Sequence, residues 1–408
     1  MRLLLALTFL LFQIHGHAQL PTTIDAQKAG FSEERLERLS DFWEQEIESG
    51  KIPSGVCMII RNGVIAHKAT YGYTNWTEKT PIEFDQIFYI QSMTKPIISV
   101  AMMMLYEEGH FQLNDPVAKY LPQFKNPQVA SFEGEEMTLE DANKPITIAQ
   151  LFSHTAGFSH GLGQSPIDQM YWKALYGGGL RADPHKTIAE RVNSMSELPL
   201  VGHPGEQWYY SASPDLLALL IEQFSGQTVD EFLRERIFDP LEMKDTGYNL
   251  PTEKGKRAAG LHASNNGKLF YAPQQTPTSG STVFGGTHGL FSTAEDYLKF
   301  ATMMLQKGEY NGKRLLSRKT VELMTANHIS GLKGNGEGFG LGFGVRTNLA
   351  EGGTLGTEGQ FYWNGAFNTY FFIDPKENMI GVMMTQLWPF NNYYSRMFRQ
   401  MVYQAIAD

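Results

Sequence analysis

The chain has 408 residues, 42% of them hydrophobic and 12% aromatic, and 34 basic against 43 acidic residues give a net charge of -9. This is the composition of a folded globular protein, and at roughly 150 residues per domain the length allows a large core and an enclosed pocket. It excludes disorder and collagen-like repeats, and without a run of Lys or Arg it excludes the electrostatic footprint of nucleic-acid binding, so we expect a small-molecule partner.

Residues 1–18 are expected to be a cleavable signal peptide. Arg2 precedes an apolar stretch, Leu3 to Ile14, that is too short to span a bilayer, and the small residue Ala18 fits a signal-peptidase site. We therefore expect an exported protein, periplasmic or secreted, with no stable membrane insertion after cleavage. The alternative is an uncleaved membrane anchor.

The first folded region reads as a helix followed by a hairpin. Ser32 can cap a helix that runs to about Gly50, and two apolar runs, Gly55 to Ile60 and Val64 to Thr70, flank the dipeptide Asn62-Gly63. An Asn-Gly pair between two such runs is a strong hairpin signal. Cys57, the only cysteine, lies in the first run and is expected to be a buried structural thiol.

A helix is predicted next, from about Met93 to Glu108, and it is apolar nearly all round, so it should be buried. Residues 111–280 then read as helix and loop. Their best-signalled helix runs from Pro214 to Phe224, with Ser213 as the expected cap.

The last region returns to strands. Thr293 and Asp296 form a capping-box pattern for a helix, and Thr369 to Ile373 and Met379 to Thr385 read as paired strands. A closing helix is expected from about Asn392 to Ile406.

These elements predict an α/β fold in which both chain ends form one antiparallel sheet flanked by helices, with a mostly helical insertion. We expect residues 26–110 and 281–408 to form the sheet domain and residues 111–280 the helical domain.

No metal site or cofactor is predicted. None of the 11 histidines shows ligand spacing, and there is no second cysteine. The alternating glycines from Gly336 to Gly344 do not fit the dinucleotide-binding pattern and read as a glycine-rich strand or tight hairpin.

Two motifs could supply a serine nucleophile. Gly157 to Gly161 match G-x-S-x-G around Ser159, but a short helical pattern precedes the motif and a loop follows it, where a nucleophile elbow needs a strand and a helix. We interpret this match as accidental.

The second motif is the S-x-x-K pair Ser92 and Lys95 at the start of the apolar helix. One helical turn brings the two side chains to one face, and burial can lower the pKa of the lysine so that a neutral amine takes the serine proton. The same spacing recurs at Ser330 and Lys333, among glycines that will not hold a helix. The alternative for the first pair is a capping serine and a lysine that reaches to solvent.

Six ordered landmarks resemble the serine β-lactamase-like family, which holds AmpC-type β-lactamases, D-alanyl-D-alanine carboxypeptidases and family VIII carboxylesterases. The resemblance is closest to the carboxylesterases and covers about residues 30 to 390. The landmarks are Phe88 to Lys95, Leu151 to Gly157, Pro204 to Ser211, Phe238 to Met243, Gly285 to Ala294 and Ile373 to Pro375.

This resemblance implies Ser92 as the acylated nucleophile, Lys95 as its activating partner and Tyr210 as the tyrosine of the family's Y-x-N motif. A tyrosine between a cationic lysine and the serine could have its phenolate favoured and pass the proton to the leaving group. The alternative for Tyr210 is a packed aromatic residue. In that case the proton relay needs another member, and His154 is the first residue to test for this role.

Departures from the family pattern indicate the substrate. Ala212 stands where a β-lactamase has Asn, and Trp363-Asn364-Gly365 stands where the family has K-T-G, so a cationic anchor is replaced by an apolar wall. The resemblance also implies that the backbone N–H groups of Ser92 and Ala366 form the oxyanion hole.

The sequence therefore predicts an exported serine hydrolase that cleaves small carboxylic esters through an acyl-enzyme on Ser92, with Lys95 and Tyr210 as proton relay. A β-lactamase or D-alanyl-D-alanine carboxypeptidase is the nearest alternative. A non-catalytic penicillin-recognising sensor is an alternative of another class.

Overall fold

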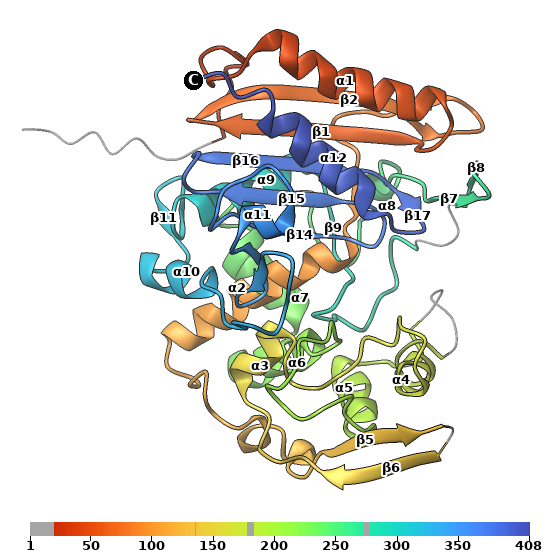
Figure 1. The fold of residues 1–408 in the computed structure, drawn as a ribbon, viewed down its shortest axis with the longest axis vertical. Helices are drawn as coiled ribbons and strands as arrows, with labels where there is room; N and C mark the ends of the chain where they lie inside the picture. The colour runs from red at the N-terminus through yellow and green to blue at the C-terminus, as the bar shows by residue number, and fades with distance from the viewer. Residues whose placement is uncertain (1–19, 135, 178–182, 273–276) are drawn as a thin grey trace, which may run out of the picture.

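The computed structural model describes residues 20–134, 136–177, 183–272 and 277–408, so the expected signal peptide lies outside the described residues. Its centre is an eight-stranded antiparallel sheet in the order β12-β13-β14-β15-β16-β1-β2-β3 (Figure 1). Strands β1 and β16 bring the two ends of the chain together, which confirms the predicted sheet. The strands are β1 (Ser54–Arg61), β2 (Val64–Asn75), β3 (Thr80–Pro81), β12 (Glu337–Phe339), β13 (Gly344–Arg346), β14 (Phe361–Asn364), β15 (Tyr370–Asp374) and β16 (Met379–Met384).

Both faces of this sheet are covered, because alternate residues of β1 enter two different cores. Cys57 and Ile59 pack with α1 (Glu33–Glu48) and α12 (Asn392–Tyr403), and Val56, Met58 and Ile60 pack with α2 (Thr94–Glu107) and α9 (Ala294–Leu305). A strand covered on both faces needs apolar residues at every position, as its sequence shows. Figure 1 shows α1 and α12 side by side over the sheet. Cys57 is a buried free thiol, as predicted.

The structure confirms one predicted hairpin turn and two predicted helix caps. The Asn62-Gly63 pair turns β1 into β2, and Ser32 accepts a hydrogen bond from Arg35 N at the start of α1. Thr293 likewise caps α9 through Asp296 N. The segment of alternating glycines forms the hairpin β12–β13, which was the expectation for it.

The insertion is helical, but it also contains strands that were not predicted. Its helices are α3 (Ile148–Ser153), α4 (Pro166–Tyr176), α5 (Ile188–Ser196), α6 (Pro214–Ser225), α7 (Val229–Leu233) and α8 (Thr252–Gly255), with a π-turn at Arg234–Phe238 and 3₁₀ turns at Val117–Lys119 and Pro122–Phe124. Two hairpins project from it: β5–β6 (Gln128–Glu133 and Glu136–Asp141) and β7–β8 (His262–Asn265 and Lys268–Tyr271).

Ser213 is not the side-chain cap of α6 that the sequence predicted. Its hydroxyl donates to the carbonyl of Leu151 at 2.7 Å and makes no capping bond. The serine therefore joins α6 to α3, and the start of α6 is held by other contacts.

Short elements complete the fold: β4 (Phe88–Tyr89), β9 (Phe291–Ser292), β10 (Glu309–Tyr310), β11 (Lys313–Arg314), β17 (Leu387–Trp388), α10 (Arg318–Met324) and α11 (Leu349–Gly352). Within the described ranges no helix has both the length and the apolar character that a membrane span requires.

Candidate active site

Ser92 lies in a tight turn that is held from several sides. The turn is a 3₁₀ helix, Gln91–Met93, directly before α2, so Ser92 precedes the α-helix instead of opening it as predicted. Strand β4 leads into the turn and pairs with β9, and the hydroxyl of Tyr297 on α9 donates to the carbonyl of Met93 at 2.9 Å. These contacts fix the backbone that carries the hydroxyl of Ser92.

Lys95 sits in the first turn of α2 and is only 1% exposed. Its Nζ lies 3.1 Å from Ser92 Oγ and donates to the carbonyl of Thr287 at 2.8 Å. Burial in this apolar helix lowers the pKa of Lys95 from 10.5 to about 7. Near neutral pH a large fraction of the amine is therefore unprotonated and has a lone pair for the serine proton.

Tyr210 reaches the same oxygen from the other side. Its hydroxyl donates to Ser92 Oγ at 2.8 Å, and the Nζ of Lys95 lies 4.6 Å from the centre of its ring. Burial raises the pKa of Tyr210. This direction is opposite to the favoured phenolate expected from the sequence, because burial favours the protonated phenol of Tyr210 and the neutral amine of Lys95.

Histidine rings pack around Tyr210. His154 contacts its ring edge-on at 4.9 Å and His160 stacks on it at 5.1 Å. His154 ends α3 with a left-handed backbone (φ 58°), and its Nδ1 lies 3.0 Å from Ser211 Oγ, so it supports the tyrosine loop. The sequence reading did not single out His160, because a lone histidine in a loop carries no pattern.

The end of β14 lies against the turn that holds Ser92. A Cβ on Gly365 would come within 2.4 Å of the carbonyl oxygen of Ile90, so only glycine allows this approach. Ala366 follows and lines the same cavity as Ser92, next to Asn364-Gly365 at the strand end. Trp363 instead packs against the rings of Tyr210 (5.5 Å) and Phe339 (5.0 Å), behind the cavity.

A cavity of about 380 Å³ opens from Ser92. The described side chains that line it are mostly apolar or aromatic: Tyr89, His160, Leu162, Tyr176, Leu261, Ala263, Phe270, Ala272, His288, Ala366, Phe367 and Trp388, with Gln91, Asp183 and Arg191. The apolar wall expected from Trp363 is therefore supplied by other residues, from β7, β8 and β17.

The cavity offers no free cation among its described lining residues. Arg191 is ion-paired with Asp183 at 2.6 Å, and burial holds the pKa of His160 well below its usual range and that of His288 at about 4. At neutral pH both imidazoles are uncharged. A substrate carboxylate would thus find no unpaired positive partner there.

The competing motifs lie elsewhere or are occupied. Ser159 is fully buried, and its hydroxyl donates to Asp168 at 2.5 Å. Lys333 of the second S-x-x-K pair and Arg346 both pair with Glu337, at 2.7 and 3.1 Å. Neither motif presents a free nucleophile or cation to Ser92.

No group of three or more side chains suited to a metal ion occurs in the described part of the chain.

Comparisons with known proteins agree with this architecture. The family model described as Beta-lactamase matches residues 38–405. Protein Rv1367c of Mycobacterium tuberculosis is 29% identical over 362 residues, which cover 84% of this chain and 88% of that protein. Lovastatin esterase of Penicillium rubens is 29% identical over 373 residues, covering 83% and 90%. Among solved structures, EstCE1, described as a hydrolase with promiscuous acyltransferase activity, superimposes with a TM-score of 0.76 at 22% identity, covering 92% of this chain and 99% of that one.

Proposed function

The chain belongs to the β-lactamase family of serine hydrolases, and from this premise we propose that it cleaves neutral carboxylic esters through an acyl-enzyme on Ser92. One observation carries the proposal: Ser92 Oγ lies within hydrogen-bonding distance of both the Lys95 amine and the Tyr210 phenol, at 3.1 and 2.8 Å. A base and an acid thus lie beside the nucleophilic oxygen.

In the acylation step Ser92 Oγ attacks the ester carbonyl carbon while its proton moves to neutral Lys95. The carbonyl oxygen gains negative charge, which the backbone N–H groups of Ser92 and Ala366 would stabilise as an oxyanion hole. The bond to the alcohol oxygen then breaks. Tyr210 donates its proton to that leaving oxygen and recovers one from the Lys95 ammonium.

Deacylation repeats the sequence with water in place of the alcohol. Neutral Lys95, with Tyr210 beside it, takes a proton from the attacking water, and the bond between Ser92 Oγ and the acyl carbon breaks. Ser92 leaves with the proton, which restores the starting state and releases a carboxylic acid.

The cavity argues for a neutral ester over a β-lactam or a D-alanyl-D-alanine peptide. Those two substrates carry a carboxylate, whereas Arg191 is already paired and Ala212 offers no side-chain amide. The apolar part of an ester can pack against Phe270 and Trp388, which are 48% and 39% exposed.

Hydrolysis of p-nitrophenyl butyrate by the purified protein tests this proposal. We expect turnover by the wild type and by Ser159→Ala, and loss of at least about 10³-fold in Ser92→Ala. A Ser92→Ala variant with wild-type activity, or a dead Ser159→Ala variant that is folded, would refute it. Stoichiometric acylation of Ser92 without turnover would instead support the penicillin-recognising sensor.

We also propose that the protein is exported. This rests on the signal-peptide pattern of residues 1–18. After expression in a bacterium the intact mass of the purified chain should correspond to a start near Gln19. A chain that keeps Arg2 and stays in the membrane fraction would favour the uncleaved anchor.

A further inference from the structure

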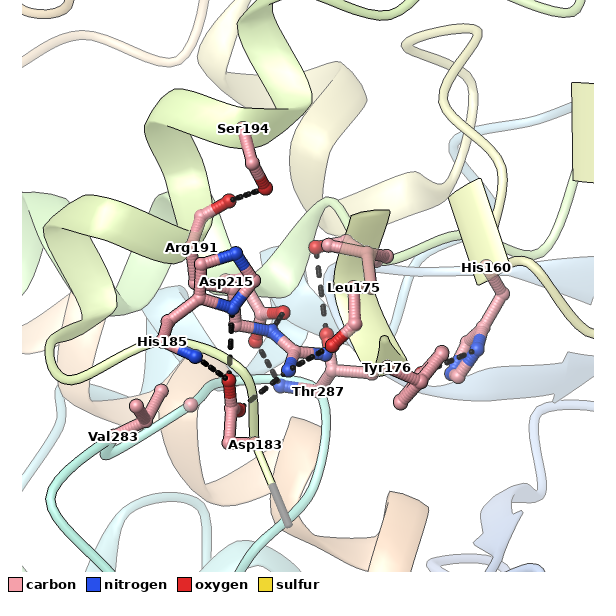
Figure 2. Close-up of polar contacts among 12 residues, drawn as sticks. His160, Leu175, Tyr176, Asp183, His185, Arg191, Ser194, Asp215, Val283 and Thr287 are labelled. Carbon is pink, nitrogen blue, oxygen red and sulfur yellow. Dashed lines mark hydrogen bonds and ion pairs between the residues drawn. The ribbon is translucent and has the colours of Figure 1, made fainter. Parts of the chain in front are cut away.

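A fully buried ion pair, Arg191–Asp215, is linked through Thr287 to the catalytic lysine, Lys95. Arg191 of α5 is 1% exposed and Asp215 of α6 is 0% exposed, and Arg191 Nε donates to Asp215 Oδ2 at 2.8 Å (Figure 2). The same guanidinium donates through Nη1 to Asp183 at 2.6 Å and to the carbonyl of Leu175 at 3.1 Å. Arg191 therefore joins α4, α5 and α6 at the wall of the cavity.

The other carboxylate oxygen of Asp215 is connected to Lys95 by two hydrogen bonds through Thr287. Asp215 Oδ1 accepts a hydrogen bond from Thr287 N at 2.8 Å, and the carbonyl oxygen of the same Thr287 accepts from Lys95 Nζ at 2.8 Å. A single residue, Thr287, thus links the buried carboxylate to the amine through its N–H and its carbonyl. Gly286 packs so tightly on α6 that a Cβ would lie 1.9 Å from the carbonyl oxygen of Pro214. Glycine at position 286 therefore allows this segment to lie directly against α6.

A purely stabilising role explains this arrangement poorly. Moving two charges out of water costs about as much free energy as their attraction regains, so buried ion pairs often add nothing to stability relative to apolar residues. The pair does have a directional effect here, because Asp215 fixes a specific backbone N–H whose own carbonyl faces the lysine.

We propose that Arg191 and Asp215 are positioning residues for Lys95: they hold the Thr287 carbonyl against its amine and place a compensated negative charge beside it. This inference rests on the proposed function only in taking Lys95 as the base. The two charges act in opposite directions on the lysine. Burial dominates its lowered pKa, Asp215 raises that pKa and Arg191 lowers it further.

The remaining groups around this network leave the sign of the effect clear. Besides Lys95, Arg191 and Asp215, the network is faced by Asp183, whose carboxylate lies 2.8 Å from Nδ1 of His185. The other titratable side chains that face it are shifted towards their neutral forms: Tyr89, His154, His160, Tyr176, Tyr210, Tyr248 and His288. When the charge of Asp215 alone is removed, Arg191 keeps Asp183 as its charged partner, and more of its positive charge acts on Lys95. The pKa of Lys95 should therefore fall.

The test measures the pKa of Lys95 directly, by ¹³C NMR of the lysine Cε in the labelled full-length protein, and in parallel the pH profile of p-nitrophenyl butyrate hydrolysis. In Asp215→Asn we expect the pKa of Lys95 to fall by about one unit. The ratio of kcat/KM at pH 6 to that at pH 8 then rises about fivefold, even if the absolute rate falls.

The double variant Arg191→Gln/Asp215→Asn removes both charges and lets the two side chains hydrogen-bond as neutral amides. Its Lys95 pKa should return towards the wild-type value. Asp374→Asn is the matched control, since Asp374 is also 0% exposed but lies at the far end of β15. This control should leave the pKa of Lys95 unchanged.

An Asp215→Asn protein in which Lys95 titrates as in the wild type would overturn the inference. If that variant does not fold, Asp183→Asn takes its place, because Asp183 is more exposed, and the same test applies with a smaller downward shift expected. A Lys95 pKa that moves while the activity profile stays fixed supports the positioning role and contradicts the proposed role of Lys95 as base.

Discussion

At the scale of single residues, the site divides its work between two groups that have opposite pKa shifts from one cause. Burial disfavours the charged form of each group, so it lowers the pKa of Lys95 to about 7 and raises that of Tyr210. In the proposed mechanism the lysine therefore acts as the base at neutral pH and the tyrosine as the acid. Ser92 Oγ lies within hydrogen-bonding distance of both groups.

We predict that ester hydrolysis depends on a single deprotonation near pH 7. Since only the neutral amine accepts the serine proton, kcat/KM should fall about tenfold per pH unit below the pKa of Lys95 and level off above it. Stopped-flow measurement with p-nitrophenyl butyrate between about pH 5 and 9 checks this. Lys95→Arg, always protonated, should lose about 10³-fold, whereas Lys333→Ala should keep the wild-type profile. An activity independent of pH over this range would contradict the assignment.

Removal of the phenol should affect turnover more than binding. Tyr210→Phe keeps the ring packed against His154 and His160 but loses the proton donor, so we predict a fall in kcat of about 10²- to 10⁴-fold with KM nearly unchanged. Tyr209→Phe is the control, since the hydroxyl of Tyr209 bonds to Asp168 instead of Ser92. Near-normal rates in Tyr210→Phe would make this tyrosine a packing residue.

The proximity of Ser92, Lys95 and Tyr210 and the lowered pKa of the lysine could be predicted from the sequence, but the raised pKa of the tyrosine could not. The S-x-x-K spacing and the buried helix were visible in the sequence, and the lysine pKa followed from them. The environment of Tyr210 depends on His154, His160 and Trp363, which are brought to it from distant segments. Arg191 and Asp215 were missed for the same reason: 24 residues separate them.

At the scale of secondary-structure elements, the contact between the end of β14 and the Ser92 turn leaves no space for a side chain at Gly365. We predict that Gly365→Ala lowers kcat at least about tenfold, because the added Cβ would meet the Ile90 carbonyl at 2.4 Å and push the proposed oxyanion hole apart. Gly334→Ala is the matched control, since a Cβ there meets nothing within 4 Å. Circular dichroism of both variants separates misfolding from a displaced site. A fully active Gly365→Ala protein would remove β14 from the site.

Elements with a strong local signal were predictable, and those defined by tertiary contacts were not. The Asn62-Gly63 hairpin and the Thr293 cap are encoded within a few residues. Strand β6 (Glu136–Asp141) is exposed at every position, so no buried face marks it, and only Met137 and Leu139 alternate with polar residues in an otherwise acidic segment. Ser213 looked like a cap, but its hydroxyl bonds to Leu151, which sequence alone does not place nearby.

At the scale of the whole molecule, the sheet built from both chain ends supports one side of the cavity and the helical insertion the other. Ala366, Phe367 and Trp388 come from the C-terminal part, and His160 and Tyr176, both labelled in Figure 2, come from the insertion. In the proposed function, substrate would bind between two segments that meet only in the folded protein. The charge state of the cavity would then govern which substrates bind there.

We predict that p-nitrophenyl butyrate is hydrolysed with a kcat/KM well above that for a chromogenic cephalosporin. The missing charge-assisted hydrogen bond to the β-lactam carboxylate is worth roughly 1.5–3 kcal/mol, or about ten- to hundredfold. Arg346→Ala should not alter the ratio, because Arg346 is paired with Glu337. A preference for the cephalosporin would contradict the ester assignment, and its loss in Arg346→Ala would identify that arginine as the anchor.

The measurement that tests the central claim most directly is the site of acylation. The protein is mixed with p-nitrophenyl butyrate, quenched in acid within the first turnovers, digested and analysed by mass spectrometry. The account predicts one butyryl group on the peptide that contains Ser92, absent in Ser92→Ala and retained in Ser159→Ala. A butyryl group on Ser159, or rapid turnover with Ser92 never acylated, would contradict it.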